Sequence, residues 1–325
     1  MAPILDVTIP FFALVLAGYL AGRLRWLPES AIPGLNSFVL YFALPCMLFR
    51  FGSSLPLMEL LNPVVLGVYL LCALVMVFGT IALTRRGSVG MKDAAFGALV
   101  AAFPNSGFMG VPLLAALLGQ AAAGPVIATV LADLVVTSSL CLALAHAGTA
   151  DTEHDGPRAA AARALRGALS NPMPWAIAAG ALFSVTGWTL PGASGTVVTM
   201  LADAATPVAL FTIGAVLHRA RQHAHGRTPP AQYLSVAAIK LLVHPALVFA
   251  AGKAAQALGL PLSDFQLMVL TLTAALPSAS SVSLLAERYG ADNGRVARII
   301  MASTAAAFVS FSALAWLFGV GARGG

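Results

Sequence analysis

Charged side chains are scarce in this sequence. Asp, Glu, Lys and Arg make up 9% of the 325 residues, hydrophobic residues make up 59%, and the mean hydropathy is +0.89. Soluble domains carry about 25% charged residues, because their surface must be hydrated. The scarcity therefore excludes a soluble globular protein. The apolar runs are about 20 residues long, the length that a helix needs to cross a bilayer, so they predict an all-α integral membrane protein.

The sequence also lacks the motifs of several function classes. Its three cysteines lie inside apolar runs without CxxC or metal-ligand spacing, so neither a disulfide framework nor a metal site is expected. It has no GxxxxGKS/T loop, no HExxH and no GxSxG. These absences argue against a nucleotide-driven pump and against a membrane enzyme, and we expect no cofactor. Most basic residues lie in short loops between apolar runs, so the net charge of +6 does not indicate a nucleic-acid partner.

What is present is a succession of ten apolar runs, separated by turns rich in Pro, Gly and Asn. They cover approximately residues 4–24, 32–51, 64–83, 93–118, 125–147, 172–188, 195–217, 233–255, 264–289 and 295–318. Most of the 18 basic residues fall in every second loop, beginning with the loop after the first run. Cytoplasmic loops carry such an excess of Lys and Arg. The pattern therefore predicts a multi-pass protein of the cell inner (plasma) membrane with both termini on the non-cytoplasmic side.

The longest loop, residues 148–170, divides the runs into two sets of five. We expect a first five-helix repeat at residues 1–147, a cytoplasmic linker at 148–170 and a second five-helix repeat at 171–325. The Ala- and Arg-rich part of the linker is expected to form a short amphipathic helix. An odd number of helices in each half makes the halves insert with opposite topology, which is an inverted repeat.

Two runs, the fourth and the ninth, are interrupted near their centres. Residues 102–114 read AFPNSGFMGVPLL, and residues 275–279 read ALPSA before a serine-rich segment. Proline removes a backbone donor, and non-helical backbone at membrane depth is tolerated where it is buried in protein or lines a wet cavity. A single interrupted run is explained by a proline kink with a purely structural role. Two at corresponding positions of two halves point to a binding site near the middle of the membrane.

These residues resemble the auxin efflux carrier family, which includes the plant PIN auxin exporters and bacterial permeases for malonate and malate. The most specific similarity is Pro104-Asn105 followed by residues 109–114, MGVPLL. Similar stretches occur along nearly the whole chain, at residues 34–39, 42–45, 201–204, 211–214 and 240–242 with Pro245, and at residues 275–277 with Glu287 and Tyr289.

The resemblance implies ten transmembrane helices in two inverted repeats of five, with crossing broken helices 4 and 9. It implies a scaffold of helices 1, 2, 6 and 7, a transport domain that moves against it like an elevator, and a homodimer formed through the scaffold. The implied function is secondary transport of a small organic anion, either auxin-like or a dicarboxylate such as malonate or malate. The large hydrophilic loop of many plant members is missing, and Ser278 departs from the family pattern, so auxin is not assumed.

The interruptions supply most of the candidate substrate-binding residues. Half-helix N-termini expose N–H groups and a partial positive charge, which suit a carboxylate. For Asn105 and for each serine the alternative is a cap on a backbone group freed by proline. For Asn36 the alternative is a cap or a hydrogen bond between helices. The candidates are Pro104, Asn105, Ser106, Pro277, Ser278, Ser280, Ser281 and Asn36.

Three ionisable residues, Asp133, Asp203 and Lys240, lie well inside apolar runs. An unpaired charge at this depth costs at least about 2.5–3.5 kcal/mol. We therefore expect Lys240 to pair with one of the two acids, either to hold helices together or to exchange partners during transport. His244 lies one turn after Lys240 on the same helix face, where it either titrates during transport or serves as a structural histidine.

Because the sequence lacks a nucleotide-binding motif, transport must be driven by an ion gradient, the membrane potential or the substrate gradient. H⁺ and Na⁺ are both candidate coupling ions. A sodium-coupled organic-anion transporter, similar to the bile-acid symporters, would fit the same pattern if carbonyl and carboxylate oxygens gathered at the crossing. A receptor or sensor without transport is a further alternative. A Ser–Lys hydrolase would need residues 278–283 next to Lys240, and no motif fixes that geometry.

Overall fold

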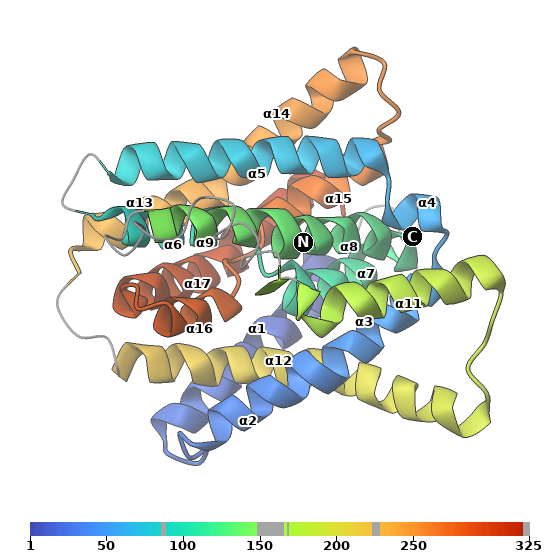
Figure 1. Ribbon diagram of the computed structural model, residues 1–325, viewed down its shortest axis with the longest axis horizontal. Coiled ribbons are helices and arrows are strands. Elements are labelled where there is room, and N and C mark those ends of the chain that lie inside the picture. Colours follow the sequence, from blue (N-terminus) through green and yellow to red (C-terminus); the bar gives the residue numbers. More distant parts are fainter. Residues whose placement is uncertain (86–88, 148–165, 168, 223–227, 321–325) are drawn as a thin grey trace.

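The computed structural model describes residues 1–85, 89–147, 166–167, 169–222 and 228–320 (Figure 1). The predicted linker helix falls on residues that lie largely outside this part of the chain. The described residues form helices, with one isolated bridge between extended residues and no longer strand. The elements are α1 (Ala2–Arg23), α2 (Ala31–Phe38), η1 (Val39–Ala43), α3 (Leu44–Ser54), α4 (Leu57–Leu60), α5 (Pro63–Thr84), α6 (Met91–Ala102), η2 (Ser106–Gly110), α7 (Val111–Leu118), η3 (Gln120–Ala122), α8 (Ala123–Ala132), η4 (Asp133–Thr137), α9 (Ser138–Ala147), α11 (Pro172–Thr186), α12 (Gly192–Gln222), α13 (Pro230–Ala238), η6 (Ile239–Val243), α14 (His244–Ala257), α15 (Asp264–Ala274), α16 (Ser281–Arg288) and α17 (Asn293–Leu317).

Seven helical segments of the described chain are long and apolar enough to cross a membrane. Three shorter apolar helices accompany them, at Ser106–Leu118, Pro172–Thr186 and Asp264–Ala274. The first and the last of these three belong to the runs that the sequence marks as interrupted. The prediction of an all-α protein is confirmed over the described residues, and the long apolar helices are consistent with an integral membrane protein.

The helices pack as two groups. In the first group, α12 packs against α1, α2 and α3, and α3 packs against α11. In the second group, α5 packs on α6, α8 and α14, α15 packs on α14 and α8, and α17 packs on α13 and α16. Figure 1 shows α2 and α12 along the lower side of the view and α5 with α14 along the upper side. Contacts of α12 with α17 and η2 join the two groups.

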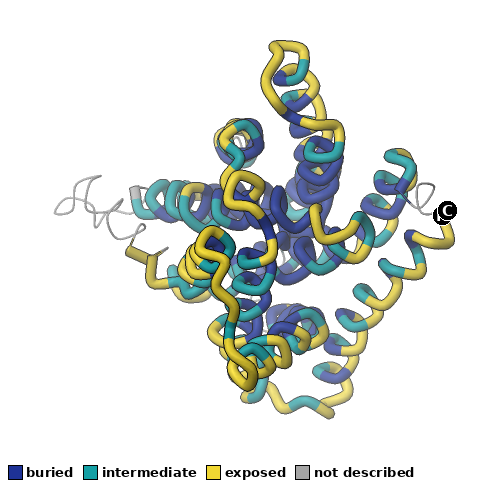
Figure 2. The backbone as a smooth tube through the Cα atoms, turned by 90° about the vertical axis from the view of Figure 1, so that its right-hand side faces the viewer, coloured by how far each residue is buried: buried dark blue, intermediate teal, exposed yellow. Residues whose placement is uncertain are grey.

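The interrupted runs lie in the interior of the molecule. In α6 every residue from Ala94 to Ala102 is buried, and in α15 every residue from Leu267 to Ala274 is buried. Figure 2 shows buried positions gathered in the middle of the molecule and exposed positions along its outer helices. A helix that is apolar and buried all round belongs to a protein core. The freed backbone groups at the ends of α6 and α15 are therefore shielded from lipid by protein.

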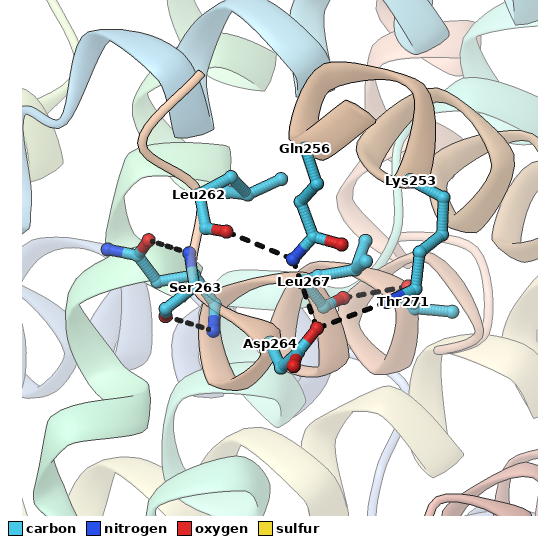
Figure 3. A network of polar contacts seen from close by, with 8 residues as sticks. Lys253, Gln256, Leu262, Ser263, Asp264, Leu267 and Thr271 are labelled. Carbon is cyan, nitrogen blue, oxygen red and sulfur yellow. Dashed lines mark hydrogen bonds and ion pairs between the residues drawn. The ribbon is translucent and has the colours of Figure 1, made fainter. Parts of the chain in front are cut away.

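A network of polar contacts fixes the start of α15 (Figure 3). The Ser263 hydroxyl accepts a hydrogen bond from the Gln266 amide, and the Gln266 side chain accepts one from the Ser263 amide, both at 3.1 Å. This is a capping box, which satisfies two backbone donors of the first turn. From α14, Gln256 and Lys253 bind the Asp264 carboxylate at 3.0 and 3.1 Å. The network therefore sets the position of α15 against α14.

Glycine contacts bring α1 and α12 together within the first group. A Cβ at Gly18 would overlap the carbonyl of Phe211, and a Cβ at Gly214 would overlap the carbonyl of Val15. Small residues that allow two backbones to touch are a common source of helix association in membranes, where apolar side chains gain nothing by leaving lipid. The two helices are therefore in direct backbone contact.

Replacing Gly214 with alanine should lower the stability of the protein by about 1–3 kcal/mol, since the added methyl group forces the two backbones apart. Thermal unfolding of the purified protein in detergent measures the change. Gly79→Ala on α5 is the matched control, because its Cβ would meet no atom within 4 Å. Equal unfolding midpoints for the two variants would contradict the backbone contact between α1 and α12.

Candidate functional site

The two interruptions cross and pair with each other. The Asn105 amide donates to the Pro277 carbonyl at 2.8 Å, and the Ala279 amide donates to the Phe103 carbonyl at 3.0 Å. Together the two bonds form an isolated antiparallel bridge. The prolines have no N–H, so residues that follow them in the chain supply both donors. The C-terminal ends of α6 and α15 and the N-terminal ends of η2 and α16 consequently meet at one crossing.

A cavity of about 530 Å³ lies beside this crossing. Residues of α8, η4 and α9 form one wall, residues of α16 form another, and Phe103, Pro104 and Asn105 belong to the crossing itself. No acidic side chain is found among the described residues of the lining. The polar and charged lining residues are Asn105, Ser138, Ser139, Arg166, Ser170, Asn171, Ser281, Arg288 and Tyr289.

Three of the predicted substrate-binding residues line this cavity, namely Pro104, Asn105 and Ser281. Asn105 is 5% exposed, and its side chain makes no hydrogen bond within the described part of the chain. A buried amide normally has partners, because an unmade hydrogen bond costs about 1–3 kcal/mol. The open hydrogen-bonding capacity of Asn105 is therefore directed at whatever occupies the cavity.

Two other serines at the interruptions, Ser106 and Ser278, have protein partners. The Ser106 hydroxyl is 3.4 Å from the Pro104 carbonyl, and the hydroxyls of Ser278 and Ser303 are 3.2 Å apart. The Ser303 hydroxyl also accepts from the Ser278 amide at 3.2 Å. These contacts match the alternative expectation for a serine near a proline, which is a cap on freed backbone groups.

The remaining candidates, Ser280, Pro277 and Asn36, are absent from the lining. Ser280 is buried directly before α16, and the Pro277 carbonyl takes part in the bridge. Asn36 lies on α2, and Leu40, one turn further along, lines the cavity in its place.

Lys240 is fully buried and binds the end of the helix that leads into the second interruption. Its ammonium group donates to the Ala274 carbonyl at 2.7 Å and lies 3.1 Å from Nδ1 of His244. Ala274 is the last residue of α15, where unpaired carbonyls carry a partial negative charge. Lys240 therefore caps the C-terminus of α15. The expected proximity of Lys240 and His244 is confirmed.

Asp133 is also fully buried, and its partners are hydroxyl groups. The Tyr69 hydroxyl donates to it at 2.7 Å and the Thr137 hydroxyl at 3.0 Å. The Tyr69 ring lies 6.0 Å from the His244 ring, so the surroundings of Asp133 and of Lys240 form one buried polar cluster. Asp133 begins η4 and Lys240 lies in η6, each within a five-residue π-helical segment, and such segments occur frequently at functional sites.

The prediction that Asp203 is a partner of Lys240 is wrong. The Asp203 carboxylate pairs with Arg50 at 2.6 Å, and its side chain is 63% exposed. Asp203 lies on α12, in the first helix group, while η6, which carries Lys240, packs with α13, α14 and α17. Nor does Lys240 form an ion pair with Asp133 within 4.0 Å in the described part of the chain, since a backbone carbonyl takes the position of the expected carboxylate.

Several lining residues were not predicted from the sequence to bind substrate. Ser138 and Ser139 line the cavity at the start of α9, and their hydroxyl oxygens have no hydrogen-bond partner in the described structure. The adjacent pair of serines in an apolar run was the signal that could have found them. Arg288 and Tyr289 also line the cavity, at the end of α16. From the sequence, Arg288 was interpreted only as one of the loop charges that set topology.

Replacing Tyr69 with phenylalanine should destabilise the protein by about 1–3 kcal/mol, because the buried Asp133 carboxyl loses one of its two donors. Thermal unfolding in detergent measures the loss. Tyr41→Phe is the control, since Tyr41 is 60% exposed. A Tyr69→Phe protein that unfolds at the same temperature as the Tyr41→Phe protein would show that the hydrogen bond to Asp133 contributes nothing to stability.

Comparison with known proteins places this chain in a family. The chain matches the family described as "Membrane transport protein" over residues 3–315. It is 28% identical to the "Putative malonate transporter" of Rhizobium meliloti (strain 1021), over 99% of this chain and 98% of that protein. It is 27% identical to an "Uncharacterized transporter" of Methanothermobacter thermautotrophicus, over 94% of this chain and 95% of the relative. It is 26% identical to the uncharacterized transporter YfdV of Escherichia coli (strain K12), over 86% and 87% of the two chains. The chain therefore belongs to this family of membrane transport proteins, which is the auxin efflux carrier family that its motifs resemble.

Proposed function

We propose that the protein is a secondary transporter of small organic anions and that its substrate binds in the cavity beside the crossing. The observation that carries this proposal is the buried side chain of Asn105, which lines the cavity and makes no hydrogen bond to the described protein. The family membership supports transport, and the surroundings of Asn105 support an anion as the cargo.

The cavity favours negative charge in three ways. Both η2 and α16 begin at the crossing, and the N-terminal end of a helix carries a partial positive charge. Asn105 and Ser281 add neutral donors. Arg166 and Arg288 line the same cavity, and the described lining holds no acid. A carboxylate would find donors and opposite charge here, whereas a cation would find repulsion.

The proposed substrates are malonate, malate and auxin-like carboxylates. The relative from Rhizobium meliloti is named a malonate transporter, which supports a short dicarboxylate first. A cavity of about 530 Å³ is large enough for each of these acids. Binding alone, without movement across the membrane, would instead make the protein a receptor or sensor.

We propose that the architecture is ten helices in two inverted five-helix repeats, with α6–α7 and α15–α16 as the crossing broken helices. The long apolar helices, together with the segments that contain shorter ones, coincide with the ten predicted runs. The group of α1, α2, α3, α11 and α12 would be the scaffold and the site of a homodimer contact. The remaining helices would carry the substrate by an elevator-type displacement, with both termini on the non-cytoplasmic side of the inner membrane.

Lys240 bears on the choice of the coupling ion. A sodium ion needs several oxygen ligands at the crossing. The Ala274 carbonyl, which could be one of them, already accepts from the ammonium group of Lys240. This contact favours a proton gradient or the membrane potential over sodium as the driving force. Uptake that depends on an imposed sodium gradient would favour the symporter alternative.

Proteoliposomes should take up malonate in a saturable manner, and Asn105→Ala should reduce the initial rate at subsaturating malonate by about 10-fold or more, because a hydrogen bond to a charged group is worth about 1.5–3 kcal/mol. Malate and indole-3-acetate are measured beside malonate, each with and without imposed proton and sodium gradients. Gln120→Ala is the control, an exposed amide side chain outside the cavity lining.

Two results would contradict the proposal. A folded protein that moves no organic anion under any gradient would leave the receptor or sensor alternative. Equal uptake by the Asn105→Ala and Gln120→Ala proteins would show that the substrate binds away from the crossing.

A further inference from the structure

One face of α16 forms a wall of the cavity, and the polarity of its side chains changes along the helix. Ser281, Leu284, Leu285 and Arg288 all line the cavity. Their spacing of i, i+3, i+4 and i+7 places them on a single helix face. Along this face a hydroxyl at the crossing is followed by two apolar side chains and then by a guanidinium group. The wall therefore offers two polar positions, one at each end of an apolar patch.

The two ends of this face are close enough for one small molecule. Seven residues of α-helix span about 10.5 Å, and helical side chains lean toward the helix N-terminus. The long side chain of Arg288 can therefore reach back over Leu284 and Leu285 toward Ser281. A carboxylate held at the crossing and a second carboxylate held by Arg288 then fall within the length of a three- or four-carbon chain.

In the described part of the chain, Arg288 has no protein partner for its charge. Within the described residues it forms no ion pair and no side-chain hydrogen bond. The neighbouring acid, Glu287, pairs instead with Arg219 of α12 at 3.4 Å. Arg166, the other charged residue of the described lining, is also a cation. An arginine that serves only to orient the helix in the membrane has no need to line a cavity, whereas one that binds an anion does.

We propose that Arg288 binds the second carboxylate of a short α,ω-dicarboxylate whose first carboxylate lies at Asn105 and Ser281. This inference rests on the proposed transport function and names its substrate class. Guanidinium binds a carboxylate through two parallel N–H donors, which gives direction as well as charge. A monocarboxylate of equal length leaves Arg288 without a partner and sets a methyl group against it. The site consequently selects dianions over monoanions.

Binding to the purified full-length protein, measured by isothermal titration in detergent, tests the assignment with pairs of acids of equal chain length. The pairs are malonate with propionate and succinate with butyrate. The wild-type protein should prefer the dicarboxylate of each pair by 10-fold or more. Arg288→Gln should remove most of this preference while propionate and butyrate affinities change by about 2-fold or less, because they lack the second charge. Arg288→Lys should restore part of the preference, since lysine keeps the charge without the planar fork.

Arg85→Gln is the matched control, because Arg85 follows α5, is exposed and does not line the cavity. The inference is overturned if Arg288→Gln weakens both members of a pair equally, which would indicate general attraction at the cavity mouth. It is overturned as well if the variant keeps the wild-type preference. Wild-type protein that binds no carboxylic acid contradicts the proposed function itself, whereas binding without preference contradicts only the role of Arg288.

Discussion

The structure depends on one constraint, which is that backbone groups freed inside a membrane protein must still find hydrogen-bond partners. The chain meets it by letting two interruptions satisfy each other. Asn105 donates to the carbonyl of Pro277, and Ala279 donates to the carbonyl of Phe103. Each interruption would be costly alone, and the pair of them forms a stable crossing. Four helix ends are thereby held at one point, and the cavity beside that point is polar because helix ends are polar.

The same constraint explains the buried charge at Lys240. The last carbonyls of α15 have no intrahelical donor, and the ammonium group of Lys240 supplies one at Ala274. The stem of the lysine is surrounded by protein, and His244 lies against its head. Asp133 sits in the same cluster with its own hydroxyl donors, Tyr69 and Thr137. Removing charges from water is expensive, so a cluster of this kind is retained where the fold or the function requires it.

Much of the fold was predictable because proline and small polar residues are conspicuous in apolar runs. Pro104 and Pro277 marked the two interruptions, and Asn105, which was predicted to bind the substrate, lines the cavity. The partner of Lys240 was not predictable from side-chain charges, because it is the partial charge of a helix end, which exists only once α15 stops at Ala274. The partner of Asp203 was predicted wrongly for a related reason. A sequence shows that an acid lies in an apolar run, but the side of the helix it occupies depends on packing, and here it faces Arg50.

The contact between α1 and α12 limits how this protein can change shape. Gly18 and Gly214 place the two backbones against each other, with no layer of side chains between them. Side chains can exchange rotamers and let two helices slide, whereas touching backbones have no such freedom. A shift of one helix along the other would bring a Cβ into a position where only the hydrogen atom of a glycine fits. The two helices therefore form a single body, which meets the second group where α12 contacts α17 and η2, where α1 contacts α17 and α7, and where α3 contacts α8.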